Sequence, residues 1–130
     1  MKKYFFLLTI IFCTDHLFAT QAIANNFDCS VKNFNVLSEV GKGDKQFIDS
    51  NLKKRFIISV DGQEIIVTSI SDTFKSSIKK YTIFSKSDLF DTVSAKSDSS
   101  YSTDIIVINT KKGTATISVQ GDFYLNAWLL

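Results

Sequence analysis

A hairpin pattern in residues 55–70 constrains the fold of this chain more than any other feature. Arg55-Phe-Ile-Ile-Ser-Val60 and Glu64-Ile-Ile-Val-Thr-Ser-Ile70 are rich in β-branched and aromatic residues, which favour strands. Asp61-Gly62-Gln63 lies between them, and Asp-Gly is typical of a tight turn because it tolerates positive φ angles. The pattern predicts two antiparallel strands joined by a short connection.

A second hairpin is predicted in residues 104–119. Two apolar stretches, Asp104 to Thr110 and Thr114 to Val119, flank a turn at Lys111-Lys112-Gly113. In the later stretch, apolar residues alternate with threonine and serine. This period of two indicates a strand with one solvated face.

Weaker strand candidates occupy residues 27–36, 80–85, 91–96 and 123–129. Helix is scarce: residues 71–79 are the candidate for a helix of two turns, and residues 45–54 are ambiguous. Short strands joined mostly by tight turns predict an all-β fold. We expect a small antiparallel β-sandwich or barrel of about seven short strands, with the choice between the two left open.

The start of the chain has the three parts of a secretory signal peptide. Met1-Lys2-Lys3 is positively charged, Tyr4 to Cys13 is apolar, and Ala22-Ile23-Ala24 offers the small residues of a cleavage site. The apolar run of about ten residues is half of what a membrane-spanning helix needs. We therefore expect residues 1–24 to be a signal peptide, residues 25–130 to be a single β-rich domain, and the protein to be periplasmic or secreted without a stable membrane anchor.

Cleavage after Ala24 removes His16, the only histidine, together with Cys13. The remaining chain then lacks the groups for Ser-His-Asp or Cys-His catalysis and for His-ligated zinc. It carries 13 Lys and Arg against 12 Asp and Glu, a net charge of +1. Because the positive and negative charges are nearly equal in number, they create no general attraction to nucleic acid. We expect no metal, no cofactor and no nucleic-acid partner.

Cys29 is the one cysteine that remains, and three interpretations stay open. It shares a parity with Phe27 and Val31, so a strand here would bury the thiol among apolar neighbours. In an oxidising compartment an odd cysteine is also a candidate for a disulfide-linked dimer. The third interpretation is a bridge to a cysteine beyond Leu130 in a longer form of the chain.

Two motifs have the spacing of catalytic groups. Ser76-Ser-Ile-Lys79 matches the Ser-x-x-Lys nucleophile motif of penicillin-binding enzymes, and Lys112-Gly113-Thr114 is similar to their second lysine element. Asp88 and Asp91 flank Leu89-Phe90 as a carboxylate pair. Ser-x-x-Lys arises readily in a chain rich in both residues, and acids near turns usually cap the backbone. A hydrolase is therefore the least favoured function.

Interface candidates are aromatic and basic. Tyr124 and Trp128 share a parity opposite to Leu125, Ala127 and Leu129, which predicts an exposed aromatic stripe on the last strand. Tyr101 is a further aromatic candidate. Three basic clusters lie at strand ends: Lys111-Lys112, Lys53-Lys54-Arg55 and Lys79-Lys80. Their charge can discourage aggregation of strand edges, or folding can bring them together as a basic patch for an acidic partner.

These features favour a non-enzymatic module that binds an envelope or extracellular protein, such as an envelope inhibitor or assembly factor. The alternative is a small β-barrel that binds an apolar ligand, which requires an apolar cavity.

Overall fold

The computed structural model describes residues 25–39, 41–122 and 124–130, so the predicted signal peptide lies outside the described residues. This part of the chain is all-β apart from one helix, α1 (Lys45–Leu52). The strands are β1 (Asn25–Ser30), β2 (Asn33–Val36), β3 (Arg55–Asp61), β4 (Glu64–Ile70), β5 (Ser77–Ser87), β6 (Thr92–Asp98), β7 (Ser102–Asn109), β8 (Thr114–Gly121) and β9 (Leu125–Leu129).

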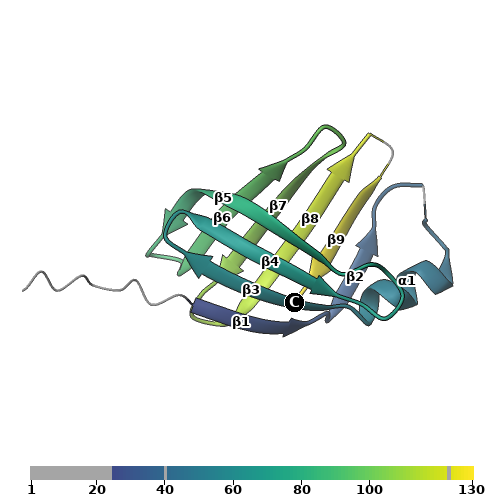
Figure 1. Ribbon diagram of the computed structural model, residues 1–130, viewed down its shortest axis with the longest axis horizontal. Helices are drawn as coiled ribbons and strands as arrows, with labels where there is room; N and C mark the ends of the chain where they lie inside the picture. The colour runs from purple at the N-terminus through teal and green to yellow at the C-terminus, as the bar shows by residue number, and fades with distance from the viewer. Residues whose placement is uncertain (1–24, 40, 123) are drawn as a thin grey trace, which may run out of the picture.

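All nine strands belong to one antiparallel sheet in the order β1-β3-β4-β5-β6-β7-β8-β9-β2. Strands β3 to β9 therefore form a continuous meander in which each strand pairs with the next. The sheet curls into a half-barrel, with β1, β3, β4 and β5 on one side and the remaining strands crossing behind them (Figure 1). A β-bulge between Ile83 and Ser85 interrupts β5 where the sheet turns from one side to the other.

The two edge strands of the sheet are consecutive in the chain. Only Val31 and Lys32 separate β1, which pairs with β3, from β2, which pairs with β9. At the junction the Lys32 amide donates a hydrogen bond of 2.7 Å to the Leu129 carbonyl. One bent ribbon thus links the two edges of the half-barrel.

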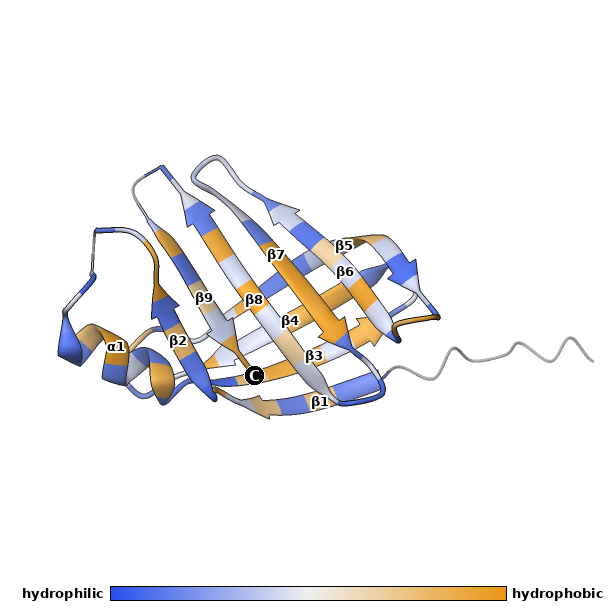
Figure 2. Cartoon of the chain, turned by 180° about the vertical axis from the view of Figure 1, so that it is seen from behind, coloured by the Kyte–Doolittle hydropathy of each residue, from blue (hydrophilic) through white to orange (hydrophobic). Residues whose placement is uncertain are grey.

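The core lies between the two sides of the sheet, where alternate residues of each strand point inward. Figure 2 shows hydrophobic residues recurring along the strands, with a continuous hydrophobic stretch in β7. The fully buried side chains on three strands include four isoleucines: Ile58 of β3, Ile65 of β4, and Ile106 and Ile108 of β7, with Ile117 of β8 almost as deep. The burial of Ala115 and Ile117 confirms the period of two predicted for residues 114–119.

Helix α1 forms in the stretch that was ambiguous from sequence. Asp44 is its N-cap, and the Asp44 carboxylate accepts a 3.0 Å hydrogen bond from the Phe47 amide. The Phe47 ring packs edge-on against Phe34 of β2 at 5.8 Å between centroids. The helix therefore covers one end of the sheet beside β2.

The prediction of a helix in residues 71–79 was wrong. The Ser71 hydroxyl accepts hydrogen bonds from the Thr73 and Phe74 amides, which forms a local turn but no helix. From Ser77 onward the backbone pairs with β4, with Ile78 opposite Thr68. Phe74 and Ile78 are four residues apart, a spacing typical of a helix, but sheet pairing has overridden it.

The strand count also differs from the expected seven or so. Residues 27–36 form two strands rather than one, because the chain bends at Val31-Lys32 to reach the opposite edge of the sheet. The other predicted strands are present with ends shifted by a few residues.

The predicted orientation of the last strand was wrong. Trp128 is buried, with 8% of its surface exposed, whereas Leu129 is 40% exposed. In the sheet, Trp128 lies opposite Phe34 and Ile117, both of them buried. The indole of Trp128 buries more apolar surface than the side chain of Leu129, and it packs against the aromatic rings of Phe34 and Phe56.

Candidate functional site

A cavity of about 130 Å³ opens between the two sides of the half-barrel. Its apolar wall includes Phe56, Val67 and Ile117, and the indole of Trp128. Its polar lining comes from four parts of the chain: Lys54, Ser69, Ser77, Lys79, Tyr81 and Asp104. Sites for drug-sized ligands are about 300–1,000 Å³, so this cavity is smaller than such a site.

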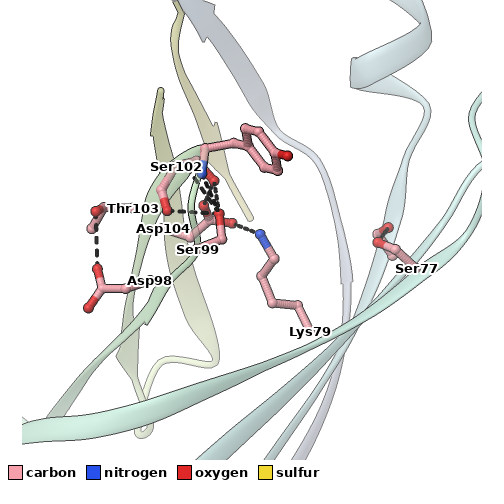
Figure 3. Close-up of polar contacts among 9 residues, drawn as sticks. Ser77, Lys79, Asp98, Ser99, Ser102, Thr103 and Asp104 are labelled. Atoms are coloured by element: carbon pink, nitrogen blue, oxygen red, sulfur yellow. Dashed lines mark hydrogen bonds and ion pairs between the residues drawn. The ribbon is translucent and has the colours of Figure 1, made fainter. Parts of the chain in front are cut away.

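Asp104 is the most buried polar group in this cavity, with 2% of its surface exposed. The Lys79 ammonium reaches from β5 to its carboxylate, and the Ser102 hydroxyl donates to its other oxygen at 3.0 Å (Figure 3). Burial, followed by the charge of Asp104 and a hydrogen bond to it, raises the pKa of Tyr81 well above its ordinary value. Asp104 is thus a fully bonded carboxylate beside a neutral phenol.

The loop between β6 and β7 holds these groups in position. The Ser99 hydroxyl accepts hydrogen bonds from the Tyr101 and Ser102 amides, at 3.3 and 3.0 Å. On the next residue of β7, the Thr103 hydroxyl donates to Asp98 at 3.0 Å (Figure 3). The serine-rich loop is therefore an ordered cap that orients Ser102 toward Asp104.

Lys54 contributes a second cation to the cavity. It follows α1 directly, and its ammonium lies 4.5 Å from the ring centre of Phe74 and 5.1 Å from that of Trp128. Burial lowers the pKa of Lys54. Unlike Lys79, Lys54 makes no ion pair with an acid in the part of the chain that the structure describes.

The Trp128 indole N–H is also unsatisfied. Among the described residues no acceptor lies within hydrogen-bond distance of it, although the atom is inaccessible to solvent. Leaving a buried donor without a partner costs roughly 1–3 kcal/mol. The cavity lining thus carries one uncompensated charge, that of Lys54, whereas the unpaired indole N–H is closed to solvent.

A second candidate site is the turn between β5 and β6, at the opposite end of β5 from Lys79. Leu89 is 83% exposed and Phe90 is 67% exposed, and Figure 2 shows this turn in the hydrophobic colour at the rim of the sheet. The Phe90 carbonyl accepts from the Asn109 side chain at 3.2 Å, and the Asp91 carbonyl accepts from the Thr110 amide at 2.8 Å. Hydrogen bonds from the β7–β8 turn therefore fix an apolar turn that faces solvent.

The β7–β8 turn contains the predicted interface residues Lys111 and Lys112, both exposed. The bonds from Thr110 to Asp91 bring this turn beside Leu89 and Phe90. We call these four residues, Leu89, Phe90, Lys111 and Lys112, the tip surface. Tyr124 and Trp128 do not join it: Tyr124 lies at the far end of β8 and is half-buried, and Trp128 is buried opposite Ile117.

The catalytic motifs do not assemble. Lys79 pairs with Asp104 instead of Ser76, and the neighbouring Ser77 hydroxyl lies 2.8 Å from that of Ser69. Asp88 and Asp91 flank the β5–β6 turn, where Asp91 adopts a φ of 52°. Aspartate tolerates such a positive φ, which is typical of a turn. The conformation of the turn is therefore sufficient to explain an aspartate at position 91.

Cys29 is buried in the core of the sheet, as its parity with Phe27 and Val31 predicted. Burial, with a smaller contribution from the charge of Asp28, raises the pKa of the thiol. Both effects suppress the reactive thiolate. Of the three interpretations of Cys29, the geometry favours a buried residue of the core.

Sequence reasoning missed both sites in their present form. Leu89-Phe90 received attention only as the spacer between two acids, although a pair of large apolar residues inside a turn was the available signal. Lys54 and Asp104 gave no periodic signal, because they line one cavity only when distant parts of the sequence fold together.

In comparisons with known proteins, no protein-family model, no curated protein and no solved structure matches the chain. Within the described residues, no group of three or more His, Cys, Asp or Glu side chains is arranged to hold a metal ion. No helix in the same residues is long and apolar enough to cross a membrane. The fold defines the chain as a single-sheet β half-barrel with a polar cavity and an apolar tip.

Proposed function

We propose that this protein is a small exported binding module without catalytic activity, which docks onto an envelope or extracellular protein through the tip surface. The observation that carries the proposal is the pair Leu89 and Phe90, exposed on a turn whose backbone is tied to the next hairpin. Such a module acts as an inhibitor or an assembly factor.

Preorganisation is the reason that the turn suits docking. Ordering a flexible loop on binding costs free energy, whereas hydrogen bonds from Asn109 and Thr110 already hold this one. Full burial of an exposed leucine or phenylalanine contributes about 1.5–3 kcal/mol each. Two such side chains inserted into a pocket supply a useful part of the affinity of a protein complex.

The charges around the turn favour a protein over a lipid surface. Asp88 and Asp91 lie on either side of the apolar pair, and Lys111 and Lys112 lie on the adjacent turn. The acids would be repelled by anionic lipid headgroups. A protein pocket can offer both signs of charge around an apolar centre, and mixed charges also select against wrong partners.

The export part of the proposal is supported by the three-part signal in residues 1–24. To test it, the full chain is expressed and the exported form is collected and weighed by mass spectrometry. We expect the mass of residues 25–130. A protein that retains residues 1–24 would contradict export by cleavage.

The docking part is tested with the exported protein and a double variant, Leu89→Ser with Phe90→Ser. A partner captured from envelope or medium proteins is purified and its affinity is measured by calorimetry. We expect the double variant to bind at least about a hundredfold more weakly, from the lost apolar burial.

Leu37→Ser is the matched control, because Leu37 is an exposed leucine in a loop away from the tip surface. Its affinity should equal that of the wild type. The proposal fails if the double variant binds as the control does, or if the protein binds anionic vesicles through Leu89 and Phe90 in place of a protein.

A further inference from the structure

We infer that the cavity between the two sides of the half-barrel binds a small carboxylate with a short apolar group, through Lys54 and the wall around Trp128. The inference is independent of the tip surface, which lies at the other end of β5. It rests on the charge, the donors and the size of the cavity.

The charge balance of the lining calls for one negative group. Three charged side chains line the cavity, and two of them, Lys79 and Asp104, neutralise each other. Lys54 is left half-buried, with aromatic faces as its neighbours and without a carboxylate among the described residues. A charge that is partly removed from water without a counterion is unfavourable, so an anion beside Lys54 would stabilise the protein.

The hydrogen-bond donors of the lining suit the oxygens of a carboxylate. The Ser69 and Ser77 hydroxyls are 2.8 Å apart, so one donates to the other and the second keeps a proton for a ligand. The Trp128 indole N–H is closed to solvent, so the donors that a ligand can reach are this hydroxyl and the Lys54 ammonium. Charge-assisted hydrogen bonds of this kind are about twice as strong as neutral ones.

The walls and the size limit the rest of the ligand. Phe56, Val67 and Ile117 make the interior side of the cavity apolar, and its volume is about 130 Å³. This is below the range of about 300–1,000 Å³ that holds drug-sized ligands. A short aliphatic chain attached to the carboxylate matches both properties, whereas a large or multiply charged anion does not.

The chain contains one tryptophan, Trp128, and its indole lines the cavity. Fluorescence and the indole N–H resonance therefore report from the proposed site without interference from another tryptophan. Butyrate is the probe, titrated against chloride at constant ionic strength, and its neutral isostere butyramide is titrated in parallel. We expect a saturable change with butyrate and none, or a much weaker one, with butyramide.

Three variants isolate the role of Lys54. Lys54→Met keeps the apolar stem but removes the charge, and we expect it to weaken butyrate binding by roughly tenfold to a hundredfold. Lys54→Arg, which keeps the charge, should retain most of the affinity. Lys53→Met is the matched control, because Lys53 is the adjacent, exposed lysine, and its affinity should be unchanged.

A carboxylate can belong to a free acid or to the end of a peptide, so N-acetylglycine, a small peptide-like acid, is titrated as well. Tighter binding of either acid supports the site and identifies the source. The inference is overturned if butyrate causes no saturable change in the wild type, if butyramide binds equally well, or if Lys54→Met binds as tightly as Lys53→Met.

Discussion

Asp104 places a carboxylate inside an aliphatic core, and its surroundings explain how the core tolerates it. Lys79 and Ser102 bond to its oxygens, and Tyr81 lies beside it. Buried ion pairs contribute little net stability, because desolvation opposes their attraction. The ion pair between Lys79 and Asp104 neutralises both charges. Lys54 is then the cation in the cavity lining that has no counterion among the described residues.

Tyr81 gives this cluster a signature in alkaline solution. Burial, the charge of Asp104 and a hydrogen bond to it raise the pKa of Tyr81 above its ordinary value of about 10. Below pH 10 the phenol is neutral in both the folded and the unfolded state. As the pH rises beyond 10 the unfolded state ionises first, so stability is lost until the folded pKa is reached.

We therefore expect the wild type to lose about 1.4 kcal/mol more unfolding free energy than Tyr81→Phe between pH 9 and pH 11. Urea unfolding at both pH values measures this difference. Tyr101→Phe, at an exposed tyrosine, serves as the control and should follow the wild type. An identical pH dependence of Tyr81→Phe and wild type would contradict the environment described for Tyr81.

Single residues also mark where sequence reasoning succeeded and failed. The parity of Cys29 with Phe27 and Val31 predicted its burial. The same parity argument failed for Trp128, because both faces of β9 carry apolar residues and only the position of Phe34 shows which face is inside. Where a strand is apolar on both faces, tertiary neighbours decide its orientation.

At the scale of elements, α1 depends on one capping side chain. The Asp44 carboxylate bonds to the Phe47 amide, and Phe47 in turn packs on Phe34. We expect Asp44→Ala to lower the free energy of unfolding by about 1 kcal/mol in urea, because an unbonded amide is left at the helix start. Asp49→Ala, on the exposed face of the helix, is the control and should change stability much less. Equal losses in both variants would exclude the cap as the cause.

Elements with local signals were predictable, and elements that depend on partners were not. Asp61-Gly62 and Gly113 identified both hairpins, because the turn itself requires positive φ, here 56° and 64° at the two glycines. Residues 71–79 have apolar residues at helical spacing, but from Ser77 onward the chain forms a strand that pairs with β4. The break at Val31-Lys32 has no local cause and follows from the distance between the sheet edges.

At the scale of the whole molecule, the junction between β1 and β2 holds the half-barrel together. The Lys32 amide bonds to Leu129 at the point where the chain passes from one edge to the other. We expect Lys32→Pro to lower the free energy of unfolding by about 1–3 kcal/mol, since it removes the donor and leaves a sheet carbonyl unpaired. Lys32→Ala keeps the amide and should be close to wild type.

Urea unfolding measures the loss, and light scattering measures association of the unpaired edges, which we expect for Lys32→Pro alone. If Lys32→Pro and Lys32→Ala were equally stable, the bond to Leu129 would not be needed for closure.

The same ribbon also implies an order of events during folding. Asn33 lies opposite Leu129 in the finished sheet, so β2 pairs with a strand from a distant part of the sequence. Hairpins from β3 to β8 close short loops, whereas contacts between residues this far apart carry the largest loop-closure penalty. We therefore expect β2 to dock on β9 after the local hairpins have formed.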